Sequence, residues 1–469
     1  MSQDLTFAFR DYQLNLIRKI YQAWTNCRRV LAQLPTGGGK TVVFGKIARD
    51  FVQKKQKVLI LAHREELILQ AARKVGKITN SEIGIIKAGY QPNEEALIQV
   101  ASVQSLVNRL DSVTNISLVI IDESHHATAN TYQKILTAFP KAYQLGVTAT
   151  PVRLDSSGFE DIFDRLISGI SVGDLIDKGY LSKFKLFADP HPMSTKGVRK
   201  LNGDYSVNEI AQANNVVELA GNLISSYQKY ADGKSCVVFA INVVHSMAIA
   251  YRYNQVGIPA CHLDGATPVK ERQEALRKFS TGEIKVISNC ALFDEGLDIP
   301  ALELVQIARP TQSLSRWLQM VGRALRTAPN KEYAIILDHT NNWSLHGLPT
   351  RPRAWSLKGV NSLKIPLEVD EDGLVRESEF DWESLEIREN ETELEQIEKS
   401  LPAEWNEIFE DLVMELEYNA YDRGWLYCQL LDFQPPLYVW QKCEQYLGYS
   451  EGWAKDCFAQ QELELNFPK

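Results

Sequence analysis

Short apolar runs alternate with segments of helical periodicity along the first third of the chain. The runs are typical of buried strands and stand at residues 30–35, 57–62, 96–102, 117–122 and 142–149. Helical spacing, with apolar residues three or four apart, occupies residues 11–24, 41–53 and 65–75. Strands buried on both faces form continuous apolar runs, and the helices between them cover the sheet. This alternation predicts a parallel sheet with helices on both faces.

A second series of the same kind begins after residue 206. Its apolar runs stand at residues 235–240, 259–263, 284–289, 303–308 and 333–339, and its helical segments at 243–254 and 269–279. The chain is therefore predicted to hold two similar α/β domains, at residues 1–185 and 206–350. Residues 186–205 are rich in Pro, Gly and polar side chains, which predicts a linker.

The last quarter of the chain has a different character. Residues 351–400 are predicted to form a linker that becomes strongly acidic, with few apolar anchors. Residues 401–469 are helix-like and rich in Trp and Tyr. They predict a small, mainly helical accessory module, which could dock a protein partner or guide a nucleic-acid strand. Its aromatic side chains fit a module core better than a base-stacking surface.

The net charge of −8 hides a division along the chain. Residues 1–365 carry 44 Lys and Arg against 32 Asp and Glu, a net +12, and residues 366–469 carry 7 against 27, a net −20. A basic body with an acidic tail suggests that the body contacts nucleic acid. On charge alone, two solvated surfaces explain the division equally well.

Membrane and secretory features are absent from the sequence pattern. No apolar run reaches the roughly 20 residues that a membrane span needs, and the N-terminal residues lack the pattern of a signal peptide. The seven cysteines form no CxxC pair, which argues against a zinc ribbon. Scattered thiols of this kind are typical of a reducing compartment, so we expect a cytoplasmic protein with no membrane partner.

Residues 34–41, LPTGGGKT, come close to a phosphate-binding loop. The strict pattern is G-x-x-x-x-G-K-[ST], and here Leu34 replaces the first glycine. The flanking segments agree with such a loop, because an apolar run precedes it and a helical segment follows it. A glycine-rich turn with a chance Lys-Thr pair is the alternative interpretation.

Each position of the loop has a chemical reason if it binds a nucleotide. Gly37, Gly38 and Gly39 would let backbone N–H groups approach phosphate oxygens closely. The start of the following helix adds a favourable dipole. Lys40 would reach the β- and γ-phosphates of ATP, and the Thr41 hydroxyl would bind Mg²⁺.

An acidic pair follows the apolar run at 117–122. Asp122 ends that run and Glu123 comes next. At a strand end beside a phosphate loop, Asp122 is predicted to hold Mg²⁺. Glu123 is predicted to act as the general base that deprotonates the attacking water. The alternative is that both acids stabilise the start of a helix.

These segments belong to a longer ordered series, and that series carries a family resemblance. The blocks are RDYQ (10–13), LPTGGGKT (34–41), LAHREEL (61–67), ASVQSL (101–106), DESH (122–125), GVTATP (146–151), VVFAINVVHS (237–246), NCALFDEGLDIPAL (289–302) and QMVGRALR (319–326). The chain resembles a superfamily 2 helicase of the DExH type, and above all the bacterial RadD-type helicases and the motor subunits of type III restriction enzymes. The resemblance implies two tandem RecA-like domains and tolerates Leu34 in the loop.

The resemblance also implies roles for residues outside the loop and the acidic pair. Gln13, with Arg10 beside it, resembles the residue that recognises adenine. Asp298 resembles a contact to the nucleotide ribose. Thr148 and Thr150 resemble the segment that couples hydrolysis to domain movement.

The last block supplies groups from the second domain. Arg323 and Arg326 resemble the guanidinium groups that stabilise charge on the transferred phosphoryl group. Their spacing of three predicts that both lie on one helix face. Gln319 resembles the residue that meets His125 across the cleft between the domains.

Nucleic acid is expected to lie across the two domains. Arg64, Ser102 and Gln104 resemble phosphate-gripping positions, and no block offers a base-specific reader. In the second domain the family usually has Thr-x-Glu-Gly, where this chain has Phe-Asp-Glu-Gly at 293–296. That departure puts the phosphate contact of this block in doubt.

The sequence thus predicts an ATP- and Mg²⁺-dependent nucleic-acid motor, with a DNA helicase as the leading interpretation. Two alternatives stay open. One is a double-stranded DNA translocase or restriction-type motor that leaves the strands paired. The other is a nucleotide-gated nucleic-acid-binding scaffold that works through its C-terminal module.

Overall fold

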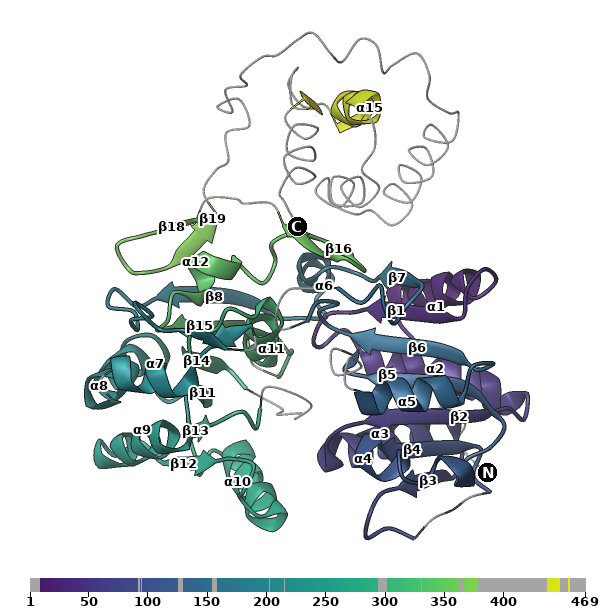
Figure 1. Cartoon of the computed structure of the whole chain (residues 1–469). Helices are drawn as coiled ribbons and strands as arrows, with labels where there is room; N and C mark the ends of the chain where they lie inside the picture. The colour runs from purple at the N-terminus through teal and green to yellow at the C-terminus, as the bar shows by residue number, and fades with distance from the viewer. Residues whose placement is uncertain are drawn as a thin grey trace. The chain divides into compact units, whose positions relative to one another are not determined.

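The computed structural model (Figure 1) describes most of the chain to residue 377 and one helix near its end. The described residues are 9–91, 93, 95–124, 130–153, 158–201, 203–214, 216–293, 302–329, 331–362, 367–377, 437–447 and 454–455. The chain divides into two compact units. The first comprises residues 1–350, 357–359 and 369–376, and the second comprises 351–356, 360–368 and 377–469.

The first unit holds two parallel sheets. In the described residues, the first sheet has the strand order β3-β4-β2-β5-β6-β1-β7, with every pair parallel. Its strands are β1 (Arg29–Gln33), β2 (Lys57–Ala62), β3 (Ile83–Ile86), β4 (Ile98–Ser102), β5 (Ile116–Asp122), β6 (Tyr143–Thr148) and β7 (Arg165–Ser168). The inner strands β2, β4 and β5 are almost wholly buried, as their apolar runs predict.

Helices cover both faces of the first sheet (Figure 1). They are α1 (Asp11–Ala23), α2 (Lys40–Gln53), α3 (Glu65–Thr79), α4 (Val103–Leu106), α5 (Asn130–Ala138) and α6 (Val172–Asp177). α2 packs against both α1 and α3 in one layer, and α4 packs against α5 in the other. Tyr132 and Ile135 of α5 bury against Val119 and Ile121 of β5 in a continuous apolar core.

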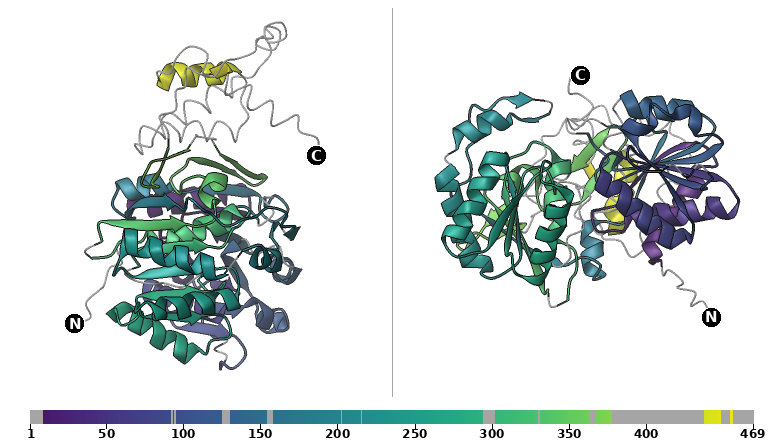
Figure 2. Two further views of the ribbon diagram at one scale, coloured as in Figure 1. Left: turned by 90° about the vertical axis from the view of Figure 1, so that its left-hand side faces the viewer. Right: turned by 90° about the horizontal axis from the view of Figure 1, so that it is seen from below.

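The second sheet has the order β12-β13-β11-β14-β15-β8, again with every pair parallel. Its strands are β8 (Lys183–Ala188), β11 (Cys236–Ala240), β12 (Ala260–Leu263), β13 (Val286–Asn289), β14 (Leu304–Ala308) and β15 (Tyr333–Asp338). Its helices are α7 (Val207–Ala213), α8 (Val216–Ala231), α9 (Val243–Gln255), α10 (Val269–Thr281), α11 (Leu314–Ala324) and α12 (Asn342–His346). The sheets appear from two further sides in Figure 2. The predicted pair of α/β domains is confirmed.

The second sheet begins earlier than the predicted boundary at residue 186. β8 pairs with β15 along its whole length, so the predicted linker 186–205 starts inside a strand. The same segment contains a short hairpin of β9 (Lys200–Leu201) and β10 (Asp204–Tyr205). β8 is an edge strand with only Leu186 fully buried, so it lacks the continuous apolar run on which the prediction depended. The Pro and Gly residues that follow β8 indicate turns, but they do not exclude an edge strand just before them.

Two strand pairs follow residue 350. β16 (Arg353–Ser356) pairs with β17 (Gly359–Ser362), and β18 (Leu367–Val369) pairs with β19 (Val375–Glu377). The predicted linker 351–400 therefore contains strands in its described part. Of the predicted module 401–469, the structure describes residues 454–455 and α15 (Leu437–Leu447), which buries Val439, Trp440 and Cys443. Among the helices described, none has the length and apolar character needed to cross a bilayer.

Candidate nucleotide-binding and catalytic site

The glycine-rich loop lies between the end of β1 and the start of α2. Gly37 and Gly39 adopt left-handed φ values of 87° and 90°, which side chains rarely accept. A Cβ on Gly39 would collide with the amide nitrogen of Gln13, and one on Gly37 would lie 2.7 Å from Leu181 Cδ2. Backbone conformation and close packing both require glycine here, so the loop is shaped as a phosphate-binding loop must be.

The first helix supports this loop from behind. The Tyr12 hydroxyl and the Gln13 amide donate to the Gly38 carbonyl at 2.8 and 3.3 Å. The Gln13 amide oxygen accepts from the Arg10 N–H at 3.0 Å, and only 3% of Gln13 is exposed. Gln13 therefore supports the loop with one N–H and one oxygen lone pair of its amide. A second N–H and a second lone pair belong to the same amide, so the adenine contact stays a prediction.

A pocket of about 290 Å³ opens in front of the loop. It gathers residues from the loop, from the end of β5, and from α11 and the segment after it. The lining residues are Arg10, Thr36, Gly37, Gly39, Lys40, Thr41, Leu67, Gln70, Ala71, Lys74, Asp122, Glu123, Tyr180, Leu181, Arg323, Arg326 and Thr327. Residues more than 280 positions apart in the sequence thus share one polar cavity.

The charged groups from the first sheet face one another in this pocket. Lys40 Nζ lies 3.5 Å from Glu123 Oε1, and both side chains are nearly buried. Burial, and after it the neighbouring Glu123 carboxylate, raises the pKa of Asp122 to about 6, against the opposing effect of Lys40. Two nearly buried carboxylates beside one ammonium form a site that is ready to bind additional positive charge.

Glu123 also has a strained backbone. Its φ of 51° is left-handed, which is uncommon for a residue other than glycine. Its N–H donates to Asp122 Oδ1 at 3.1 Å. Residues held in such conformations concentrate at functional sites, where the surrounding structure keeps them in place. The strain agrees with a catalytic rather than a helix-stabilising role for this acid.

Arg323 reaches the pocket from α11 and is 5% exposed. Its Nε donates to the Phe293 carbonyl at 3.1 Å. The helix can approach the loop because of Gly322, where a Cβ would lie 2.9 Å from Thr36 Cβ. Arg323 therefore lines the same pocket as Lys40 and Glu123.

Arg326 does not share a helix face with Arg323, so that prediction is wrong. α11 ends at Ala324, and Arg326 forms an antiparallel bridge with Leu181. A spacing of three aligns two side chains only while the helix continues. Arg326 still lines the pocket because the chain turns along its wall.

Lys331 holds this turn in place, although no motif marks it. Its ammonium donates to the carbonyls of Leu302 at 2.7 Å and Arg326 at 2.8 Å, and also to that of Ala324. The last carbonyls of α11 thus find a donor, as helix ends require. Burial lowers the pKa of Lys331 to about 8. Sequence reasoning had no signal for it, because a lysine after a Pro-Asn turn is ordinary.

The predicted coupling segment contacts α11 directly. The Thr150 and Ser315 hydroxyl oxygens are 2.5 Å apart, and the Thr148 hydroxyl donates to the Thr150 carbonyl at 3.0 Å. Gln319 is buried on the same helix. Its predicted partner His125 lies outside the described residues, as does the predicted ribose contact Asp298.

The predicted nucleic-acid contacts have partners within the protein. Arg64 Nη1 donates to the carbonyls of Ala291 and Leu292, which follow β13 of the second sheet, both at 3.2 Å. Ser102 is 7% exposed and donates to Gln104 Oε1 at 3.0 Å, whereas Gln104 is exposed. Arg64 thus joins the two sheets, and contact of these three residues with nucleic acid stays a prediction.

Tyr180 is a pocket residue that sequence reasoning missed. The Arg10 guanidinium carbon lies 4.0 Å from the centroid of its ring, and the Tyr12 ring lies 5.5 Å away. Stacked arginine and aromatic groups are a common platform for a planar base. The 170 positions between Arg10 and Tyr180 leave no local pattern that could have revealed the pair.

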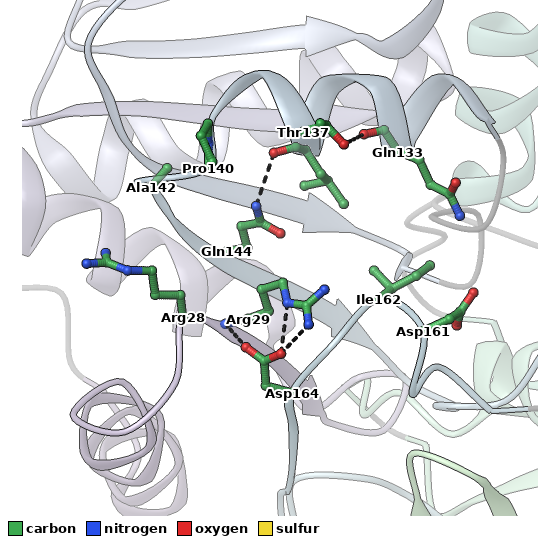
Figure 3. A pocket seen from close by; sticks show the side chains of 11 residues that line it. Arg28, Arg29, Gln133, Thr137, Pro140, Ala142, Gln144, Asp161, Ile162 and Asp164 are labelled. Carbon is green, nitrogen blue, oxygen red and sulfur yellow. Dashed lines mark hydrogen bonds and ion pairs between the residues drawn. The ribbon is translucent and has the colours of Figure 1, made fainter.

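A larger pocket, of about 590 Å³, lies at the opposite end of the first sheet (Figure 3). It opens where β1 and β6 begin. Arg29 Nε donates to the Asp164 carboxylate at 2.8 Å, and the Gln144 amide donates to the Leu136 carbonyl at 3.3 Å. No residue of the glycine-rich loop lines this pocket. Its larger volume is therefore not evidence that it binds a nucleotide.

Two family matches include β1 to β6 of the first sheet and β11 to β14 of the second. Residues 6–153 match the family described as "Type III restriction enzyme, res subunit", and residues 216–328 match the "Helicase conserved C-terminal domain". A 51.5 kDa protein of a Lactococcus phage is 36% identical over 325 residues, which are 69% of this chain and 68% of that protein. The chain belongs to the superfamily 2 helicases. As a member of this superfamily, the protein is an ATP-hydrolysing nucleic-acid motor.

Other relatives carry helicase or translocase names. The Saccharomyces cerevisiae protein named "Putative ATP-dependent helicase IRC3" is 30% identical over 75% of this chain, and this chain covers 54% of that protein. "DNA 3'-5' translocase XPB2" of Sulfurisphaera tokodaii is 28% identical over 73% of this chain and 84% of that protein. The fold is similar to a type I restriction enzyme HsdR fragment from Vibrio vulnificus, with a TM-score of 0.56, 21% identity, and coverage of 74% and 68%.

Proposed function

We propose that this superfamily 2 helicase hydrolyses ATP with Mg²⁺ in order to move along DNA and separate its strands. The observation that carries the proposal is the pocket that Lys40, Glu123, Arg323 and Arg326 line together, with Lys40 paired to Glu123. A phosphate-binding lysine, a carboxylate base and two guanidinium groups are the parts that phosphoryl transfer to water needs.

Thr41 and Asp122 are the proposed ligands of Mg²⁺. Both line the pocket beside the glycine-rich loop, and a hydroxyl with a carboxylate is the oxygen donor set that this ion prefers. Within the described part of the chain, no cluster of three or more His, Cys, Asp or Glu is placed to hold a metal. ATP phosphates and water would therefore supply the remaining oxygen ligands. When held by Thr41 and Asp122, Mg²⁺ would supply positive charge that offsets the charge of the phosphates.

The ion pair between Lys40 and Glu123 suggests how the site is prepared for ATP. Lys40 pairs with Glu123 at 3.5 Å, which keeps both charges satisfied in a nearly buried cavity. When the phosphates arrive, Lys40 gains a stronger partner and Glu123 becomes available to take a proton from the attacking water. Arg323 lies on α11, which packs on the second sheet, and Arg326 follows that helix, so they would complete the site only while the two sheets are closed over ATP.

DNA is the proposed track for two reasons. Residues 1–365 carry a net +12, which suits a polyanion. A relative that matches 73% of this chain is named a DNA translocase. The C-terminal module 401–469 is the proposed position for a protein partner.

Steady-state ATPase rates test this function, measured alone and with single-stranded DNA, duplex DNA and single-stranded RNA. We expect single-stranded DNA to give the strongest stimulation, followed by ATP-dependent unwinding of a forked duplex. Stimulation by duplex DNA alone would favour the double-stranded DNA translocase. Stimulation by RNA alone would indicate that the protein moves along RNA. Equal rates with and without all three would favour the nucleotide-gated scaffold.

If the adenine of ATP stacks at Tyr180, replacing Tyr180 with alanine should raise the KM for ATP about tenfold, because stacking of a base on an aromatic ring contributes about 1–3 kcal/mol. The kcat should change little, since the ring would contact the base rather than the reacting phosphate. Tyr180→Phe keeps the ring and should behave as the parent protein. An unchanged KM in Tyr180→Ala would show that the base binds elsewhere.

A further inference from the structure

After α12 the chain passes from the second sheet to the first. The start of this stretch is fixed to α11, because Trp317 Nε1 donates to the Gly347 carbonyl at 3.1 Å. The His346 ring stacks on the same indole, which is wholly buried. Leu357 comes ten residues after Gly347 and lies on the first sheet. The stretch therefore begins on the helix that carries Arg323.

The tip of the β16–β17 hairpin, residues 357–359, docks on the first sheet. The Leu357 side chain packs against the apolar core that contains Phe159, Ile162 and Phe163. The Phe159 N–H donates to the Leu357 carbonyl at 2.5 Å. The tip belongs to the same compact unit as both sheets. An apolar side chain and a backbone hydrogen bond thus hold it in place.

Gly158 lets the tip come this close. A Cβ at Gly158 would lie 1.7 Å from the Leu357 carbonyl oxygen and 2.6 Å from the Lys358 carbonyl carbon, and real Cβ atoms essentially never approach so closely. The φ of Gly158 lies outside the left-handed region, where side chains are unfavourable. The approach of the tip, rather than the value of φ, is therefore what requires glycine here.

The docking point follows the predicted coupling segment. Phe159 comes nine residues after Thr150, whose hydroxyl oxygen lies 2.5 Å from that of Ser315 on α11. Both positions lie in the connection between β6 and β7. The tip therefore joins this connection to α11 a second time, through the chain that starts at Gly347.

Beyond the hairpin the chain is attached to the second sheet again. The Ala188 N–H, at the end of β8, donates to the Gly373 carbonyl at 2.8 Å. The Tyr230 hydroxyl of α8 donates to the Asp372 carbonyl at 2.7 Å. The chain is thus held to the second sheet before and after the tip, while the tip itself docks on the first sheet.

We propose that the docked tip is a strap that guides the closure of the two sheets over ATP. Residues 169–182 already join β7 to β8, and the tip adds a second point of attachment. Two bodies attached at two points rotate about the line that joins these points, which is hinge closure.

The strap also limits how far the sheets separate. The ten residues from Gly347 to Leu357 span at most about 33–36 Å when fully extended. A guided rotation returns Arg323 to one place in the nucleotide pocket at each closure. This inference rests on the proposed closure of the sheets over ATP, and it adds the element that guides that closure.

A Gly158→Ala variant tests the strap in the full-length protein. The added methyl group displaces the tip and leaves Leu357 itself unchanged. Leu357→Asp is the second variant, because a carboxylate is costly to bury in an apolar core. Lys358→Ala is the matched control, since Lys358 is exposed in the same turn. Far-UV circular dichroism that matches that of the parent shows that each variant is folded.

Hydrogen exchange and steady-state ATP hydrolysis are measured on all of these proteins. We expect the Phe159 amide to lose its protection in Gly158→Ala and in Leu357→Asp. The kcat should fall about 10–100-fold in both, because a small misplacement of catalytic groups costs up to about 100-fold in rate. The KM for ATP should change less. The double variant should lose no more than the more impaired single variant, because both substitutions break one contact.

The outcomes separate the strap from the motor. A parental kcat in variants whose Phe159 amide exchanges freely would overturn the strap. A lower kcat with the amide still protected would also overturn it, because the loss would not come from undocking. Multiplied losses in the double variant would overturn it as well. A parent that hydrolyses ATP at a rate that no nucleic acid changes would overturn the DNA motor alone, and the kcat values would still decide on the strap.

Discussion

Replacing Glu123 with glutamine should lower the steady-state rate of ATP hydrolysis about 10²–10⁴-fold, the usual contribution of a general base. Glutamine keeps the size of the side chain and its hydrogen-bonding reach but cannot accept a proton from water at neutral pH. ATP should bind at least as tightly as in the parent, because Lys40 loses the carboxylate that lies 3.5 Å away and is free to meet the phosphates.

Two measurements on Glu123→Gln separate chemistry from binding. Phosphate release gives the turnover, and titration with a fluorescent ATP analogue gives the affinity. Glu82→Gln is the control, since Glu82 is exposed and lies outside the pocket. Parental turnover would show that Glu123 is not the base. Loss of both turnover and affinity would indicate that the carboxylate supports the pocket instead.

The strands that the sequence predicts best are those buried on both faces of a sheet. β2, β4 and β5 are buried on both faces, so each is a continuous apolar run that pattern alone reveals. β3 and β8 are edge strands whose burial alternates or fades. β3 has only four residues and is interrupted by Gly84, and β8 is interrupted by Lys183 and Lys185, so a local pattern does not distinguish either strand from a loop.

The chemistry divides in the same way. The glycine-rich loop and the Asp122–Glu123 pair are each a short continuous segment, so the sequence pattern alone locates both. Lys331 and Tyr180 depend on contacts between distant segments, and only the folded chain reveals them. Arg326 shows the limit of helical spacing, since the residues that end α11 decide where its side chain goes.

Replacing Arg323 with alanine should lower the nucleic-acid-stimulated ATPase rate about 10³–10⁵-fold, the range found for arginine groups that stabilise phosphoryl transfer. The expected loss lies in kcat, because Arg323 enters from the second sheet and should act in the closed state. Arg323→Lys should recover only part of the rate, since an ammonium cannot reproduce the planar, multidentate contact of a guanidinium. Phosphate release at saturating ATP and DNA measures both variants.

The burial of Arg323 makes a structural control necessary. Only 5% of the residue is exposed and its Nε donates to the Phe293 carbonyl, so alanine could loosen α11 as well as remove a charge. Arg277→Ala on α10 is the matched substitution, because Arg277 is exposed and pairs with Glu274 on its own helix. If Arg323 serves catalysis, Arg323→Ala should bind ATP and single-stranded DNA as the parent does while the stimulated rate collapses. An unchanged stimulated rate in Arg323→Ala would show that Arg323 takes no part in the reaction. Arg326 would then be the guanidinium that approaches the phosphate.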